Sequence, residues 1–218
     1  MKESSLHSEI KKAYSLPGDQ FEVKLDNYIV DILRENLVIE VQTKNFSALK
    51  EKLQVLTENH QVRLVYPLPE KKWITNVTKD QVVLNKRKSP RKGKLTDLFQ
   101  ELVMIPHIIK NENFSLEVLF IEEEEVRCDD GNGSWRRKGV SIKERKLLKV
   151  NDRILFLNKS DYLKILPNNL TGVFTNRELA KLGKFSLRAA RQITYCLRKS
   201  GAIRLVEKKR RELIFQKV

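Results

Sequence analysis

The sequence predicts an α/β fold of the α+β type, in which a mixed sheet flanked by helices is followed by a small C-terminal domain. Short runs rich in Ile, Val and Leu suit buried strands, and they alternate with segments whose apolar residues recur at helical spacing. The chain has 218 residues, 40% hydrophobic and 33% charged, which is enough for a real core under a heavily charged surface. After Pro167-Asn168-Asn169 the pattern changes to two capped helices and a hairpin, which indicates a boundary.

The first elements follow one another closely. Residues 5–15 carry a modest apolar face at helical spacing and predict a short helix. A strand is expected over residues 21–25, with a turn at Asp26-Asn27. Two further strands, residues 28–34 and 37–42, then form a hairpin around the turn Glu35-Asn36.

This hairpin brings two acids together. A two-residue turn pairs Arg34 with Leu37 and sets Asp31 opposite Glu40, on one face and about 4.5–5.5 Å apart at Cβ. A three-residue turn would set Asp31 opposite Ile39, so the inference depends on the register. Two unpaired carboxylates repel each other and are costly to desolvate, and a divalent cation such as Mg²⁺ or Mn²⁺ removes both problems. The arrangement therefore favours metal-assisted phosphodiester hydrolysis.

Asp31, an eight-residue gap and then Glu40-Val41-Gln42 resemble the signature of the PD-(D/E)xK nuclease superfamily. The resemblance implies a restriction-endonuclease-like core in which Asp31, Glu40 and the Val41 carbonyl hold the metal. The water-activating position, a Lys in most of that superfamily, is Gln42 here. An amide positions water but carries no charge.

Other residues compete for roles in this site. Lys44, or Lys50 on the following helix, is a candidate for the missing cation. The resemblance also implies a metal ligand from the first helix, for which Glu9 is the candidate, although an ordinary exposed acid is the alternative. Asp26 competes with Asp31 as first ligand, but a turn residue needs no further explanation.

The next elements agree with the superfamily core in their order. Asn45 is a suitable N-cap for a helix over residues 46–58. Residues 62–66 form an apolar strand that is expected to end at Pro67. The resemblance thus covers residues 5–75.

A second hairpin is expected over residues 73–77 and 81–84. It leads into KRKSPRKGK, residues 86–94, which has six cations and no acid. Pro90 and Gly93 favour a loop, and the charge favours contact with a phosphate backbone. The candidate contacts are Lys86, Arg87, Lys88, Arg91, Lys92 and Lys94.

The middle of the chain carries a helix or pair of helical turns over residues 95–109 and a buried strand over 114–121. The acidic run Glu122–Glu125 is interpreted as solvated or facing a basic surface rather than as a metal site. Arg136 and Arg137 are further candidate DNA contacts. The neighbouring Trp135 either stacks on a base or packs against the domain. Short strands are expected over residues 140–157.

The C-terminal segment resembles a winged helix-turn-helix. Thr175 and Glu178 form a capping box for one helix, and Ser186 caps a second over residues 187–199. Two apolar segments follow, separated by a basic turn. The resemblance implies DNA contact, with protein docking as the alternative. The residues concerned are Arg188, Arg191, Gln192, Arg198, Lys208, Lys209, Arg210 and Arg211.

Composition agrees with a nucleic-acid partner. The 43 Lys and Arg outnumber the 28 Asp and Glu, for a net charge of +15, which favours a polyanionic partner, nucleic acid (double-stranded DNA above all) first and an anionic membrane second. Cys128 and Cys196 have no metal-ligand spacing and are expected to be reduced thiols. The N-terminus has no secretory pattern, and the apolar stretch 102–109 is too short to span a bilayer, so no membrane partner and a cytoplasmic location are expected.

The sequence thus predicts a nuclease-like core over residues 1–85, a basic loop and α+β extension over 86–166, and a winged helix over 167–218. The predicted function is a Mg²⁺- or Mn²⁺-dependent DNA endonuclease. One alternative is a DNA-binding regulator that keeps the fold without activity, and another is an RNA- or ribosome-associated basic protein. A homodimer is plausible for double-strand cleavage.

Overall fold

The structure, a computed structural model, describes residues 5–210 and 212–218. Five α-helices are found there: α1 (Ser5–Tyr14), α2 (Lys50–Asn59), α3 (Leu98–Leu102), α4 (Asn176–Leu182) and α5 (Leu187–Ser200). The strands are β1 (Gln20–Leu25), β2 (Tyr28–Arg34), β3 (Leu37–Val41), β4 (Gln61–Val77), β5 (Val83–Lys88), β6 (Phe114–Asp129), β7 (Val140–Phe156), β8 (Val173–Thr175), β9 (Ile203–Lys209) and β10 (Glu212–Lys217). The expected mixed α/β class is confirmed.

Seven strands form one mixed sheet in the order β1-β2-β3-β4-β6-β7, with β5 paired to β4. β3 and β6 run parallel to β4, and the other pairs are antiparallel. Val38 packs in the cluster that contains Leu53 of α2, whereas Ile39 packs with Ile10 of α1. Since successive strand residues point to opposite faces, α1 and α2 cover opposite faces of the sheet.

The hairpin of β2 and β3 has the register predicted from a two-residue turn. Arg34 pairs with Leu37, and Ile32 pairs with Ile39. Glu35, in the turn, adopts the left-handed conformation with φ 51°. The preceding turn at Asp26 is also found, with φ 50°. The register on which the acid pair depends is therefore present.

The expectation that a strand ends at Pro67 is wrong, because β4 continues through Pro67 and Pro69 to Val77. On one side β4 pairs with β3 only as far as Val65, and with β5 only from Trp73. Both prolines lie in the interval between, where this edge of β4 has no strand beside it. Proline has no N–H to donate, and an open edge requires none.

Asn45 is not an N-cap by its side chain. It has φ 61° and no capping hydrogen bond, and the chain enters a 3₁₀ helix, η1 (Phe46–Leu49), before α2 begins. The basic segment 86–94 is not a loop throughout, because Lys86–Lys88 belong to β5. The helix expected over 95–109 is broken into short turns around α3. Pro106 contributes to this, since a proline disfavours helix at the residue before it.

The acidic run lies inside β6, which extends well beyond the strand expected over 114–121. Its acids pair with cations on other strands of the sheet: Glu122 with Lys71 of β4 at 2.6 Å, and Glu124 with Lys86 of β5 at 2.8 Å. Charge compensation across the sheet therefore allows the strand to continue. Residues 140–156, expected as short strands, likewise form the single strand β7.

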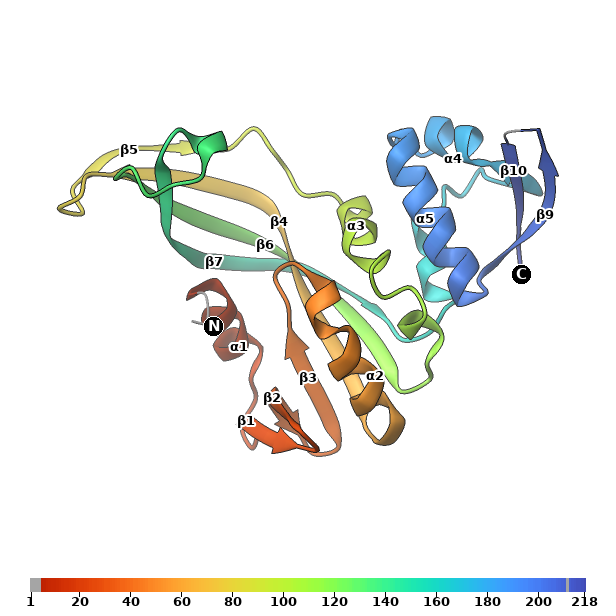
Figure 1. The fold of residues 1–218 in the computed structure, drawn as a ribbon, viewed down its shortest axis with the longest axis horizontal. Coiled ribbons are helices and arrows are strands. Elements are labelled where there is room, and N and C mark those ends of the chain that lie inside the picture. The colour runs from red at the N-terminus through yellow and green to blue at the C-terminus, as the bar shows by residue number, and fades with distance from the viewer. Residues whose placement is uncertain (1–4, 211) are drawn as a thin grey trace.

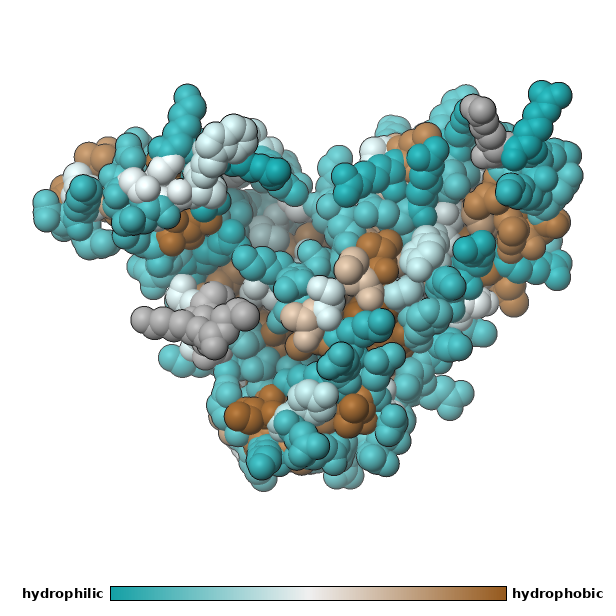
Figure 2. All heavy atoms as spheres, in the orientation of Figure 1, coloured by the Kyte–Doolittle hydropathy of each residue, from teal (hydrophilic) through white to brown (hydrophobic). Residues whose placement is uncertain are grey.

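Figure 1 shows β4, β5, β6 and β7 extending away from the helices as an arm. The C-terminal unit, β8 to β10 with α4 and α5, lies on the other side, and α3 lies between the two. Figure 2 shows a largely hydrophilic notch between the arm and the C-terminal unit. One hydrophobic cluster includes Leu64 of β4 together with Ile193 of α5 and Phe215 of β10. The C-terminal unit is thus packed onto the core.

The predicted caps of the C-terminal helices are confirmed. Glu178 N–H donates to Thr175 Oγ1 at 3.2 Å, and Thr175 N–H donates to the Glu178 carboxylate at 2.7 Å. Ser186 Oγ accepts from Ala189 N–H at 3.1 Å. Within the part of the chain that the structure describes, no helix is long and apolar enough to cross a membrane.

Candidate nuclease and DNA-binding site

Asp31 and Glu40 meet where β2 and β3 separate. The strands pair as far as Ile32 and Ile39, one residue before the acids. There Val41 N–H donates to Asp31 Oδ2 at 2.8 Å, and Asp31 N–H approaches Glu40 Oε1 at 3.4 Å. These reciprocal contacts bring both carboxylates to one gap between the strands.

The Asp31 carboxylate turns toward α1. His7 Nε2 lies 3.0 Å from Asp31 Oδ2, and Lys11 Nζ lies 3.6 Å from Oδ1. Lys11, almost fully buried, also pairs with Glu22 of β1. Burial opposes ionisation of Asp31, but His7, the Val41 N–H and Lys11 together hold its pKa below the usual value. Asp31 is therefore ionised at neutral pH.

The Glu40 carboxylate turns toward α2, where Lys52 Nζ lies 2.6 Å from Oε1. Glu40 is only 3% exposed. Burial raises its pKa to about 7; Lys52 opposes this shift, and the charge of Asp31 adds to it. A buried carboxyl that shares its surroundings with a second acid titrates near neutrality and is sensitive to any added cation.

The two acids are thus neighbours but are held from opposite faces of the sheet. The prediction that both side chains project from one face is corrected by their partners, which belong to α1 for Asp31 and to α2 for Glu40. The physical reason is the separation of β2 from β3, which lets Asp31 turn into the gap.

The other predicted members of the site lie elsewhere. The side-chain amide of Gln42 donates to the Asn45 carbonyl at 3.1 Å, so it is turned toward its own loop. Lys44 is exposed. The Glu9 carboxylate accepts a hydrogen bond from the Leu147 N–H of β7 rather than facing Asp31. The cations beside the acids are Lys52 for Glu40 and Lys11 for Asp31.

Lys52 and His7 were missed in the sequence. Both project from helices that reach the hairpin only through tertiary packing. Residues 5–210 and 212–218 contain no group of three or more His, Cys, Asp and Glu side chains arranged to hold a metal ion. The oxygen donors available to a hard cation are the carboxylates of Asp31 and Glu40 with the Val41 carbonyl. Oxygen donors of this kind are the type that Mg²⁺ or Mn²⁺ prefers, and both carboxylates also face cations of the chain, with which a metal ion would compete.

Two of the predicted basic segments meet at one cleft. The loop after β5 lies against the start of α5, and they enclose a hollow of about 340 Å³. Asp97 is the acid among its lining residues, and its carboxylate accepts from Lys94 N–H. We call this hollow the basic cleft; its cations are Arg91, Lys92, Lys94, Lys184 and Arg188.

The basic cleft continues along β4. A second hollow of about 250 Å³ shares Arg91 and Gln100 with it and reaches Tyr66 of β4 and Glu101. The Glu101 carboxylate accepts from Phe46 N–H at 3.1 Å, in the segment that follows β3. This contact ties α3 to the segment after β3, but the residues lining the two hollows include neither Asp31 nor Glu40.

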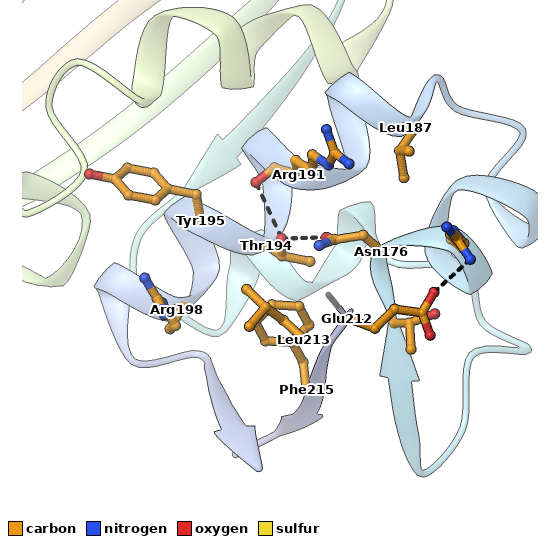
Figure 3. Close-up of a pocket in the computed structure, with 11 residues that line it drawn as sticks. Asn176, Leu187, Arg191, Thr194, Tyr195, Arg198, Glu212, Leu213 and Phe215 are labelled. Carbon is orange, nitrogen blue, oxygen red and sulfur yellow. Dashed lines mark hydrogen bonds and ion pairs between the residues drawn. The ribbon is translucent and has the colours of Figure 1, made fainter. Parts of the chain in front are cut away.

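α5 presents an exposed stripe of Arg188, Arg191, Tyr195 and Arg198, spaced three and four residues apart. The last three also line a hollow of about 500 Å³ between α4, α5 and β10 (Figure 3). In that view Thr194 Oγ1 donates to Asn176 Oδ1 at 2.7 Å and ties α5 to α4. Gln192, one helical turn after Arg188, lies with it in the basic cleft.

The remaining predicted DNA contacts are distributed over two other places. Lys86, Arg87 and Lys88 lie on β5 of the arm, and Arg136 and Arg137 lie in the short 3₁₀ turn that connects β6 with β7. Lys208, Lys209 and Arg210 are exposed at the turn between β9 and β10, and Arg211 lies outside the described residues.

A family model described as "Domain of unknown function (DUF8091)" matches residues 4–157. The chain belongs to the DUF8091 family. The match ends one residue after β7, so the DUF8091 region comprises the seven-stranded sheet, the acid pair and the arm. The C-terminal unit lies beyond it.

A protein of Treponema pallidum (strain Nichols), described as an uncharacterized protein, is 32% identical to this DUF8091 chain over 183 residues. The alignment covers 84% of this chain and 73% of the Treponema protein. It therefore extends past residue 157 toward the C-terminal unit. No solved structure matches the chain.

Proposed function

We propose that this protein is a metal-dependent DNA endonuclease of the PD-(D/E)xK type, with a winged-helix unit that grips the duplex. The observation that carries the proposal is the strand gap, where Asp31 and Glu40 exchange contacts through the Val41 and Asp31 amides. The register of the β2–β3 hairpin supports the proposal, because it brings the backbones of Asp31 and Glu40 next to each other, although their carboxylates are held from opposite faces of the sheet.

The residues of the chain have separate roles in this proposal. Asp31, Glu40 and the Val41 carbonyl would hold Mg²⁺ or Mn²⁺, which when bound lowers the pKa of a water molecule and stabilises charge on the phosphate. His7 and Lys11 keep Asp31 ionised. Lys52 favours the charged form of Glu40 and supplies the cation that Gln42 lacks.

The DNA would be bound at the basic cleft beside the start of α5. The five cations of the basic cleft suit successive backbone phosphates, which position a duplex without reading its sequence. The exposed stripe on α5 has the residue types that contact groove edges and phosphates. The order β8, α4, α5, β9, β10 agrees with a winged helix-turn-helix.

Plasmid cleavage tests the proposal. Wild type is incubated with supercoiled plasmid and Mg²⁺ or Mn²⁺, beside Asp31→Asn, Glu40→Gln and Lys52→Met. A matched control is Glu35→Gln, an exposed acid on the same hairpin. We expect nicked or linear product from wild type and the control, with a loss of at least a hundredfold in the Asp31 and Glu40 variants. Cutting by all variants at the wild-type rate would overturn the assigned site. Linear product without a nicked precursor would indicate that two copies act together.

A second candidate is a DNA-binding protein that does not cut. It is favoured by the contacts that already compensate the acids: Lys52 on Glu40, and His7 with Lys11 on Asp31. In that case no variant or metal produces cleavage, while wild type still retards duplex DNA in a salt-sensitive manner.

A further inference from the structure

The end of the arm carries an aromatic side chain that the proposed cleavage site does not use. Trp135 is 89% exposed, in the single 3₁₀ turn η4 (Trp135–Arg137) between β6 and β7. Of the two explanations that the sequence allowed, packing against the domain is therefore excluded. An indole is a large hydrophobic group that proteins usually bury or place against a partner.

The turn that carries Trp135 is well braced. Gly133 N–H donates to the Gly139 carbonyl at 2.7 Å, and Arg137 Nε donates to the Val140 carbonyl at 3.1 Å. A Cβ on Gly133 would lie 1.9 Å from the Val140 oxygen, so the two sides of the turn are in direct contact. The indole is thus presented on a fixed support and loses little conformational freedom on binding.

The turn between β4 and β5 leaves the sheet at the same end as the segment that carries Trp135. Val77 of β4 pairs with Val83 of β5 and with Cys128 of β6, so the turns 78–82 and 130–139 leave the sheet at one end. In Figure 1 the 78–82 turn lies at the far left end of the arm, and the 130–139 segment folds back from that end, so that its short helical turn lies above β5 in this view. Val82, Val83 and Leu84 are 60%, 61% and 64% exposed. We call this end the arm tip, residues 78–84 and 130–139.

The charges at the arm tip identify the kind of partner. Arg136 and Lys138 follow Trp135 in the sequence, are exposed, and have no ion-pair partner among the residues described. Asp130 is compensated by Lys143, and the exposed acids here are Asp80 in the 78–84 turn and Asp129 beside Asp130. Lys86 and Lys88 of β5 lie near the ring of Trp73, at 5.9 and 6.0 Å from its centroid. Aromatic rings among cations are the combination that binds unstacked bases together with their phosphates.

We propose that the arm tip binds single-stranded or locally unpaired DNA, with Trp135 stacking on a base while Arg136 and Lys138 contact the flanking phosphates. This inference rests on the proposed DNA binding and adds a substrate class, namely DNA with an unpaired segment near the cleavage site. The arm and the C-terminal unit then contact the same DNA on two sides of the notch in Figure 2.

Tryptophan fluorescence tests this directly, because the chain has two tryptophans. Trp73→Phe leaves Trp135 as the sole indole. Adding a duplex with a short single-stranded gap should quench its emission, and the fully paired duplex should quench it much less. In a mobility-shift assay, Trp135→Ala should weaken binding to gapped DNA about tenfold, as expected for one stacked base. Trp135→Phe should retain most of the affinity.

The outcomes separate this inference from the proposed function. Gapped DNA that is retarded without quenching, or bound equally by Trp135→Ala, overturns the stacking and leaves the nuclease proposal standing. A wild type that retards no DNA overturns both. Vesicles of phosphatidylcholine and phosphatidylserine test the alternative partner, a lipid surface, by the same fluorescence measurement. A blue shift with vesicles and none with DNA would assign the arm tip to a lipid surface and overturn the inference.

Discussion

The raised pKa of the buried Glu40 carboxyl predicts that the unfolding free energy of the protein depends on pH. The folded-state pKa of Glu40 is raised to about 7, against an ordinary value of 4.5. A carboxyl with a raised folded-state pKa stabilises the protein while protonated. That stability is fully present below the unfolded-state pKa, and it is lost as pH rises through the folded-state pKa. A pKa difference of one between the two states corresponds to about 1.36 kcal/mol, so Glu40 removes about 3 kcal/mol of unfolding free energy between about pH 4 and pH 8.

The substitution Glu40→Gln isolates this effect, because the amide is nearly the same size and does not titrate. We expect the unfolding free energy of wild type, measured by guanidinium denaturation in EDTA, to fall by about 3 kcal/mol relative to the variant over that range. The exposed Glu35→Gln should follow wild type. Asp31 has a lowered pKa and acts in the opposite direction, below its ordinary value of 3.8, so it does not interfere. Parallel curves for wild type and Glu40→Gln would refute the account of a buried, desolvated acid.

Four further predictions concern other parts of the molecule. Lys52→Met should move the loss of stability attributed to Glu40 to higher pH, since Lys52 lowers that pKa; an unchanged midpoint in the same denaturation series contradicts it. Phe46→Ala should cost about 3–5 kcal/mol of unfolding free energy, because Phe46 is fully buried and packs edge-on against Tyr66 at 5.3 Å. Thr175→Ala should cost about 1 kcal/mol by the loss of a helix cap, whereas Thr175→Ser should cost little in the same measurement. Arg188→Ala should weaken duplex binding and reduce the slope of log K against log salt by about one, and a slope equal to that of wild type would exclude a phosphate contact.

Much of the local structure could be predicted because it depends on nearby residues. The turn Glu35-Asn36 fixes the register of the hairpin, and the register fixes which residues lie opposite one another. The Thr175 and Ser186 caps mark the starts of α4 and α5, since each cap bonds within its own first turn. Helix caps and two-residue turns are specified within a few residues, and the sequence displays them.

The predictions that were wrong concern features that depend on residues far away in the sequence. A proline at position 67 predicts the end of a strand, but the missing N–H has no cost because no strand lies beside that edge of β4. The acidic run of β6 is unsuited to a buried strand until cations such as Lys71 are placed next to it. Lys52 and His7 join the acids only after α2 and α1 pack on the two faces of the sheet. No spacing in the sequence records such contacts.

The central claim is that Asp31 and Glu40 together hold a divalent cation, and calorimetric titration with Mn²⁺ tests it most directly. At about pH 8, where Glu40 is ionised, we expect one site per chain in wild type and in Glu35→Gln. That site should disappear in Asp31→Asn and in Glu40→Gln, each of which removes one charged oxygen ligand. Binding of equal strength in Asp31→Asn, or no binding by wild type, would contradict the claim and favour the second candidate, a DNA-binding protein that does not cut.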